Sequence, residues 1–461
     1  MIAIIIVNWN KKNYILNLLS NLKDIPESAD IIVVDNASTD DSVSAIKKNH
    51  PIVTLIENEK NTGGSGGFNT GMKWGLENDY EYLWLLDNDA NINMETLTGL
   101  VDVLNKNPHI GVVGSTICYP ENHGYVVEQG GMVDWNSGIW KACHMNSKFS
   151  DLSVTNNDVD YVAACSMLIR SNILKKTDLF DKKLFIHWDD IDFCLRCKKH
   201  GYSVVSTKNS IVYHHGENDC PPDFIYYNFR NSLIIMSTHL NGLEKIFAIY
   251  NQLRRILKGK YLSHLLQDKT AYNIFTNSIK DFNSEQFYKI PQSININDNA
   301  HNSDECVDIN ECKNFLILPY GSIQDIENCI SFIKSKSSMN IVTILIQKER
   351  ARFLSNKSDI DNIIYFLGER GSLKNNIKNL LRIFISNYDM GVVATKHLRI
   401  PFYTFFLKKN IIYNPDLKKI NSLKYNRLDI LKLIPAFLLG ELAAIFLLPK
   451  TLKTAKKIKN S

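Results

Sequence analysis

Carboxylates follow two apolar stretches near the start of this 461-residue sequence. Asp35 comes after residues 31–34, and Asp87 and Asp89 come after residues 82–86. Alternate residues of an extended segment project to the same side, so Asp87 and Asp89 could bind one cation together. Carboxylate oxygens suit Mg²⁺ or Mn²⁺, and such an ion can neutralise a diphosphate leaving group. The pattern predicts a divalent-metal site, although the Asp35 segment could instead be a helix N-cap cluster.

A second acidic group, Asp189, Asp190 and Asp192, follows Trp188 in the segment HWDDID. Three carboxylates within four residues repel one another unless they have a purpose or are fully solvated. The apolar residues around them favour a partly buried cleft, where a carboxylate could take a proton from an acceptor hydroxyl. The alternative is a solvated helix start, because acidic residues suit helix N-termini.

Two histidines, His214 and His215, end the apolar stretch at residues 203–213. A neutral imidazole could supply a third ligand to the metal. The sequence does not distinguish which of the two would do so, and a histidine pair taken alone is more often structural or exposed.

Four glycines in five residues form the centre of the segment NTGGSGGFNTG, which runs from Asn61 to Gly71 and includes Gly63 and Gly64. Glycine permits close approach of the backbone to a ligand, and backbone N–H groups leading into a helix suit phosphate. We expect a glycine-rich turn at residues 63–67 followed by a helix. The segment is not a Walker loop, because no Gly-Lys-Ser/Thr follows it. A flexible loop is the alternative.

Strand and helix patterns alternate through the first half of the chain, which indicates an α/β fold with a mainly parallel sheet. The expected strands are residues 3–8, 31–34, 52–56, 82–86, 161–169 and 203–213. Ligands of such sheets bind beyond the carboxyl ends of the strands, where Asp35 and Asp87 stand.

A second α/β pattern begins near residue 314, after a linker rich in Asn, Asp and Ser. Its expected strands are residues 314–318, 341–346, 362–366 and 390–394, with helices near 322–334 and 372–386. No carboxylate cluster or glycine-rich phosphate loop accompanies these strands, which favours a packing or assembly module. The predicted organisation is residues 1–240, a helical segment and linker at 241–311, the second α/β domain at 312–415, and a tail at 416–461.

The tail combines positive charge with an apolar helix. Of the net charge of +5, residues 416–461 contribute +7 and the remainder −2. Residues 433–448 are nearly all apolar but fall short of the ~20 residues that a membrane-spanning helix needs. An interfacial helix with a polybasic anchor fits better, and a core helix with a solvated tail is the alternative. The charge is too localised to indicate nucleic-acid binding. Nine scattered cysteines suggest reduced thiols and a cytoplasmic location.

Taken in order, the segments IIIVNWN, VVDNASTDDS, NTGGSGGFNTGM, LLDNDA, HWDDIDFCLR and VYHHG resemble glycosyltransferase family 2, with its GT-A fold, over roughly residues 1–240. The glycine-rich segment and W-D-D-x-D-F are most similar to the galactofuranosyl- and rhamnosyltransferase branch. Relatives often carry three consecutive acidic residues at the metal site, whereas this chain has Asn88 in the middle.

The resemblance implies a role for each candidate residue. Asp190 would be the catalytic base, and Mg²⁺ or Mn²⁺ would be bound by Asp87, Asp89 and His214. The substrate-binding residues would be Asp35 at the nucleotide, Asn61, Gly63 and Gly64 near the donor, Trp188 in the acceptor pocket, and Asp189 and Asp192 at sugar hydroxyls.

The expected function is inverting transfer of galactofuranose or rhamnose from a UDP- or dTDP-sugar to a lipid-linked glycan of a cell-surface polysaccharide such as O-antigen or capsule. The tail would hold the enzyme at the inner face of the cytoplasmic membrane, and a homo-oligomer is a further expectation. Two alternatives remain at this point, a sugar nucleotidyltransferase and a non-catalytic subunit of a glycan-synthesis complex. The first would usually show a glycine-rich basic loop after the first strand, where this chain reads NWNKK.

Overall fold

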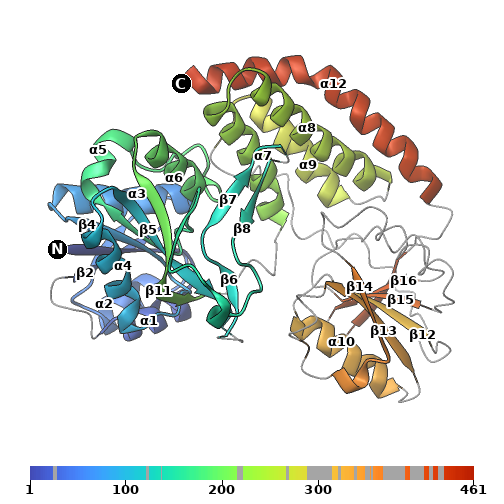
Figure 1. Cartoon of the computed structure of the whole chain (residues 1–461), viewed down its shortest axis with the longest axis horizontal. Helices are drawn as coiled ribbons and strands as arrows, with labels where there is room; N and C mark the ends of the chain where they lie inside the picture. Colours follow the sequence, from blue (N-terminus) through green and yellow to red (C-terminus); the bar gives the residue numbers. More distant parts are fainter. Residues whose placement is uncertain are drawn as a thin grey trace.

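Figure 1 shows the computed structural model, in which a mixed sheet, a layer of long helices and a second, smaller sheet follow one another along the chain. The structure describes residues 1–287 and 314–460, except for the following segments: 24–28, 121–123, 137, 215–221, 266–268, 320–322, 337–339, 348–353, 355–356, 367–389, 395–409, 415–418 and 424–429. The expected linker and the expected helix at 372–386 lie outside the described residues.

The first sheet has the strand order β3-β2-β1-β4-β10-β5-β11-β9, with β6 paired to β5. Its strands are β1 (Ile2–Asn8), β2 (Ala29–Asp35), β3 (Thr54–Glu57), β4 (Tyr82–Asp87), β5 (Ile110–Cys118), β6 (Val126–Glu128), β9 (Asn156–Asp158), β10 (Ser166–Arg170) and β11 (Ser203–Tyr213). Strands β3, β2, β1 and β4 are parallel, and β10 joins them antiparallel. The predicted α/β fold with a largely parallel sheet is confirmed.

Helices cover both faces of this sheet, which explains why its strands read as continuous apolar runs. Along β1, Ala3 and Ile5 pack into one core, and Ile4 and Ile6 pack into the other. The helices of this part are α1 (Lys12–Asn21), α2 (Ser42–Asn49), α3 (Gly63–Glu77), α4 (Met94–Lys106), α5 (Leu174–Thr177) and α6 (Asp189–Lys199).

The glycine-rich segment is part of helix α3, so the expectation of a turn at residues 63–67 is wrong. Gly63, Gly67, Gly71 and Gly75 recur every fourth residue and therefore lie on one face of the helix. A Cβ atom would lie 2.6 Å from Val7 at position 67 and closer still to Ile5 at position 71. Gly67 and Gly71 therefore let α3 approach β1 more closely than residues with a side chain would.

Residues 118–166 contain short strands that the sequence analysis did not identify. Strands β7 (Gly131–Asp134) and β8 (Ile139–Ala142) form a hairpin outside the main sheet. The central strand β5 was also missed, because its sequence IGVVGSTIC includes two glycines and two hydroxyl residues.

A layer of long helices follows the first sheet, and the end of the chain belongs to it. It consists of α7 (Pro222–His239), α8 (Gly242–Leu265), α9 (Lys269–Asn283) and α12 (Ile430–Asn460). Ala444, Ala455 and Ile458 of α12 belong to the same buried cluster as Ala3 and Ile5 of β1. Glu441 of α12 accepts hydrogen bonds from Tyr250 and Arg254 of α8. It also forms ion pairs with Arg254 and with Lys258 of the same helix.

The end of the chain is therefore a helix with one buried face, rather than a detached tail. Along α12, Leu438, Leu442, Ile445 and Phe446 are exposed on the side opposite the buried residues. Among the described residues, none of the helices is long and apolar enough to cross a membrane.

The second sheet has the order β14-β13-β12-β15-β16-β17, and its first five strands are parallel. Its elements are β12 (Asn314–Pro319), α10 (Ile323–Lys336), β13 (Ile341–Gln347), β14 (Asn362–Phe366), β15 (Met390–Ala394), β16 (Asn410–Asn414) and β17 (Lys419–Leu423). Strand β17 pairs antiparallel with β16, so the sheet continues beyond the expected boundary at residue 415.

Candidate active site

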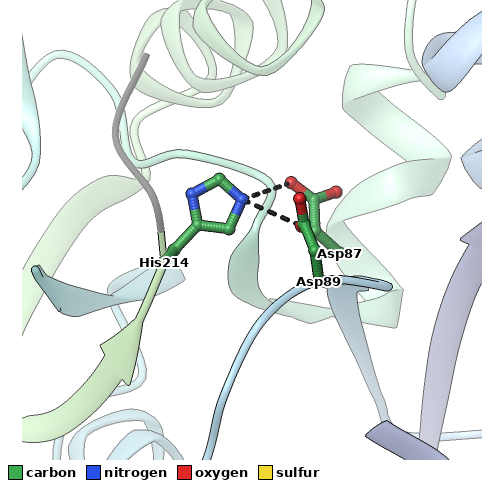
Figure 2. A group of neighbouring side chains, drawn as sticks. All are labelled: Asp87, Asp89 and His214. Carbon is green, nitrogen blue, oxygen red and sulfur yellow. Dashed lines mark hydrogen bonds and ion pairs between the residues drawn. The ribbon is translucent and has the colours of Figure 1, made fainter. Parts of the chain in front are cut away.

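The structure brings Asp87, Asp89 and His214 together at one end of the first sheet, as Figure 2 shows. His214 Nε2 lies 3.0 Å from Asp89 Oδ1 and 3.7 Å from Asp87 Oδ2. One ligand atom from each residue lies within 4.8 Å of the other two. Two carboxylates and an imidazole form a donor set that suits a divalent cation such as Mn²⁺ or Mg²⁺. His215 lies outside the described residues.

Backbone pairing places the histidine beside the two aspartates. Asn91 and Tyr213 exchange two backbone hydrogen bonds of 2.8 Å, which join the turn after β4 to the end of β11. His214, the next residue, donates its N–H to the Cys118 carbonyl at the end of β5. Three strand ends therefore converge on the cluster, as expected for a site beyond the carboxyl ends of strands.

The charges of the cluster depend on one another. Burial lowers the pKa of His214, but the hydrogen bond with Asp89 and the charge of Asp87 outweigh it and raise that pKa to about 9. Burial raises the pKa of Asp87 to about 6 against the attraction of His214. Protonated His214 supplies the positive charge that lies beside the two carboxylates. A divalent cation that binds the three residues would displace this proton and supply the positive charge itself.

Asp190 lies close to this cluster, because one turn contacts both. Ala164 donates its N–H to Asp190 Oδ2 over 3.3 Å, and Cys165 accepts a hydrogen bond from the N–H of Asp87. Burial raises the pKa of Asp190 well above its ordinary value, and the charge of Asp189 adds to this effect. A carboxyl group with a raised pKa suits a general base that works near neutral pH.

The neighbours of Asp190 have other partners. Asp189 Oδ2 accepts a hydrogen bond of 2.9 Å from Ser65 Oγ of α3. Asp192 is 3% exposed and lies between Arg196, at 2.8 Å, and His239, at 2.7 Å. Both oxygens of Asp192 are thus occupied by protein groups, which favours a structural role over the expected contact with a sugar hydroxyl.

Trp188 is 2% exposed, and its Nε1–H donates to Asn228 Oδ1 of α7 over 2.7 Å. The indole belongs to the same buried cluster as Ala3 and Ile5 of β1. This burial differs from the expected position on the wall of an acceptor pocket, because the apolar ring and its polar atom are both covered by protein.

Asp35 organises the turn after β2. Its Oδ2 accepts from the Ser38 N–H at 2.8 Å, and its Oδ1 accepts from Ser38 Oγ and Asn8 Nδ2. The amide of Asn8 in turn accepts a hydrogen bond of 3.0 Å from Asn88 Nδ2. An aspartate carboxylate at position 88 could not donate this hydrogen bond. The Asn88 amide therefore links the turn that carries Asp87 and Asp89 to the turn after Asp35.

Asn61, Gly63 and Gly64 lie where α3 begins. Asn61 Oδ1 accepts from the N–H of Gly63 over 2.8 Å and from Asn36 Nδ2 over 3.1 Å. Gly63 has φ +74, and a Cβ there would collide with the Phe185 carbonyl. The start of α3 is therefore packed against the segment that leads to Asp189 and Asp190.

Sequence reasoning missed Glu128, a carboxylate next to the candidate site. Glu128 is 7% exposed on β6, and Tyr161 donates to its Oε2 over 3.4 Å. Burial raises the pKa of Glu128 to about 7, and its charge reaches both His214 and Asp190. No motif signals this residue in the sequence, because a single glutamate in a three-residue strand has no pattern.

Comparison with known proteins gives matches to the first half of the chain. The family model described as glycosyl transferase family 2 matches residues 3–175. This part of the chain is similar to glycosyltransferase family 2. The matched range ends before Asp190 and His214, so the family 2 domain accounts for the strands that carry Asp35, Asp87 and Asp89.

Among curated proteins, galactofuranosyltransferase GlfT2 of Mycobacterium tuberculosis is 24% identical over 224 residues, which are 44% of this chain and 35% of that protein. N-acetylglucosaminyl-diphospho-decaprenol L-rhamnosyltransferase of Mycobacterium tuberculosis is 22% identical over 52% of this chain and 86% of its own length. The chain spans about a third of the length of its galactofuranosyltransferase relatives. Among solved structures, S. aureus TarS has 17% identity and a TM-score of 0.42 over 74% of this chain and 53% of TarS.

Proposed function

We propose that this protein is an inverting glycosyltransferase that moves galactofuranose or rhamnose from a UDP- or dTDP-sugar to a lipid-linked glycan of a cell-surface polysaccharide. The observation that carries the proposal is the convergence of Asp87, Asp89 and His214 at strand ends next to the half-buried carboxyl group of Asp190. The relatives named galactofuranosyltransferase and rhamnosyltransferase support the choice of sugar.

Asp190 is the proposed base. The acceptor hydroxyl oxygen forms a bond to the anomeric carbon while the bond from that carbon to the diphosphate oxygen breaks, and Asp190 takes the hydroxyl proton. Attack from the face opposite the leaving group inverts the configuration. Desolvation, with the charges of Asp189 and Glu128 adding to it, raises the pKa of Asp190 and so favours proton uptake.

Asp87, Asp89 and His214 would hold Mg²⁺ or Mn²⁺, which neutralises charge on the departing nucleoside diphosphate. Asp35 is buried and Asn61 is half-buried, which supports a role for both in shaping the donor site through the turns that they hold. We assign donor contact to those turns and to the start of α3, where Gly63 and Gly64 lie.

The deciding experiment is incubation of the full chain with a panel of nucleotide sugars and a lipid-linked acceptor, with Mn²⁺ or Mg²⁺ and then with EDTA. We expect one donor to release its nucleoside diphosphate only with metal, and the product to have inverted anomeric configuration by NMR. Asp89→Asn should lose this activity, and Asp102→Asn, an exposed residue of α4, is the matched control.

Other outcomes would overturn the proposal. Release of a nucleoside triphosphate when pyrophosphate is added would identify a sugar nucleotidyltransferase. If no donor in the panel releases nucleoside diphosphate with an authentic acceptor present, the protein would be a non-catalytic subunit.

We further propose that the outer face of α12 contacts the cytoplasmic face of the membrane. Exposed apolar residues, Leu438, Leu442, Ile445 and Phe446, occupy the first half of that face, and exposed lysines, Lys450, Lys453, Lys456 and Lys457, continue it. An apolar strip followed by positive charge complements an anionic bilayer surface.

Vesicle flotation would test the membrane contact with the full chain, because α12 is part of the core and its removal would expose α8. We expect binding to phosphatidylcholine vesicles that contain phosphatidylglycerol, and at least tenfold weaker binding after Leu442, Ile445 and Phe446 are all changed to Ser. Ile52→Ser, at an exposed apolar residue outside α12, is the control. Equal binding by the triple variant and the control would refute the contact.

A further inference from the structure

The turn before Asp189 has an unusual backbone. Phe185, His187 and Trp188 have φ values of +66, +63 and +70. Residues with a side chain pay about 1–2 kcal/mol for this left-handed conformation, so three in four residues persist only when their surroundings impose it. The turn ends at the first residue of α6, and Trp188 forms the N-cap without a side-chain hydrogen bond to the helix. The positions of Asp189 and Asp190 therefore depend on what holds residues 184–188.

One face of α7 contacts this turn along its length. The residues Phe224, Tyr227, Asn228 and Asn231 follow the spacing of a single helix face. Phe224 meets the His187 ring edge-on at 4.5 Å, and Tyr227 stacks on Phe185 at 5.5 Å.

Asn231 makes the most concentrated set of contacts. Its side-chain amide Nδ2 lies 2.9 Å from the carbonyl oxygens of Leu184 and Ile186 and 2.8 Å from that of His187. Its Oδ1 accepts hydrogen bonds from Arg230, whose guanidinium also donates to the Leu184 carbonyl. Asn231 is fully buried, and its hydrogen bond to the buried Leu184 carbonyl is shielded from water, so loss of the amide would leave that carbonyl without a donor.

The opposite side of the turn is held by α3. Ser65 donates its N–H to the Phe185 carbonyl over 3.1 Å, and its hydroxyl donates to Asp189. The turn is thus enclosed between the first residues of α3 and one face of α7, and Asn231 is the side chain that contacts three of its carbonyls.

We propose that Asn231 is a positioning residue for Asp190, acting through the left-handed turn 184–188. This inference rests on the proposed function, in which Asp190 takes the acceptor proton. Asn231 need not touch substrate, because loss of its amide would release three carbonyls and let the turn relax toward negative φ. The Asp190 carboxylate would then leave the N–H of Ala164.

The test compares Asn231→Ser with Thr238→Val in the full-length protein. Thr238 lies on the same helix, and its hydroxyl bonds to the Ile234 carbonyl within that helix. We expect Asn231→Ser to lower kcat for sugar transfer by about 10- to 100-fold with the donor KM within about threefold. Thr238→Val should change neither. Asn231→Asp, which keeps the shape but loses the donors, should resemble Asn231→Ser.

A double-mutant cycle separates positioning from general damage to the fold. In an Asp190→Asn background, Asn231→Ser should lower the residual rate by less than about twofold, because the group that it positions is already disabled. A further decrease equal to that in the wild-type background would refute the inference.

Hydrogen exchange of the amides at 184–190 gives a readout that needs no activity. We expect exchange at least tenfold faster in Asn231→Ser than in Thr238→Val, with the strands of the first sheet unchanged. Equal exchange in the two variants would refute the role of Asn231 in the turn. A wild-type protein inactive with every donor would refute the proposed function instead, and the exchange comparison would still decide what holds the turn.

Discussion

Asp87 and Asp89 share one histidine at the ends of strands, whereas Asp189, Asp190 and Asp192 lie on one turn of helix and have separate partners. In the first group, a single proton on His214 balances two carboxylates and could be exchanged for a cation. In the second group, each carboxylate is bound by fixed protein groups. The comparison suggests that the first group binds an exchangeable cation, and that the second group positions one carboxyl group for proton transfer.

Asp190→Asn should have the largest effect and should separate the two groups. The amide cannot take a proton, so we expect kcat to fall by about 10³-fold, within the range for loss of a general base. Mn²⁺ binding, measured by calorimetry, should stay within about twofold of wild type. A variant that loses metal affinity along with activity would show that the two groups are one site.

Asp192→Asn should affect stability rather than chemistry. The change leaves Arg196 and His239 without their buried anion, which costs on the order of 3 kcal/mol. Urea unfolding measures this cost, and kcat per folded molecule should remain within about threefold of wild type. A large loss of kcat with normal stability would return Asp192 to the substrate-binding residues.

Metal affinity should increase with pH. His214 has a pKa of about 9, so below that value a cation must displace its proton, and the fraction of neutral His214 rises as the pH rises. We expect the Kd for Mn²⁺ to fall by about tenfold per pH unit between pH 7 and 8.5. Calorimetry in buffers of different ionisation enthalpy should show about one proton released. A pH-independent Kd would show that the histidine is not a ligand.

Glu128→Gln should have the smallest effect, on the pH dependence of stability. The folded-state pKa of Glu128, about 7, lies above the ordinary glutamate value. Its contribution to stability is therefore complete below the ordinary value and is lost as the pH rises to about 7. Between pH 4.5 and 7.5 we expect the wild-type protein to lose about 2 kcal/mol relative to Glu128→Gln. Parallel pH profiles in thermal unfolding would contradict this.

The sequence was most informative where a residue that can bind a metal or a proton stands at the end of an apolar strand. Asp87 and Asp89 could be placed because they end a continuous apolar strand, and His214 because it ends another. Arg196 lies four residues after Asp192, a spacing that predicts an ion pair on a helix, but the partner His239 could not be predicted, since it lies 47 residues away on α7. Local pattern contains no information about such pairing. Glycine recurs every fourth residue at positions 63, 67, 71 and 75, and this spacing predicts a helix that packs closely against its neighbour. The high glycine content of the segment alone suggested a turn or loop.

The place of α12 in the core has a consequence for how the protein is made. Ala444, Ala455 and Ile458 complete the same buried cluster as the first strand of the chain. Proteins fold from the N-terminus during synthesis, so the first sheet can form early. The face of α8 that α12 covers stays exposed until residues 430–460 have been synthesised. Assembly of the helical layer therefore depends on a segment that is synthesised long after the first sheet, and a chain interrupted before Ile430 would leave that apolar surface of α8 exposed to solvent.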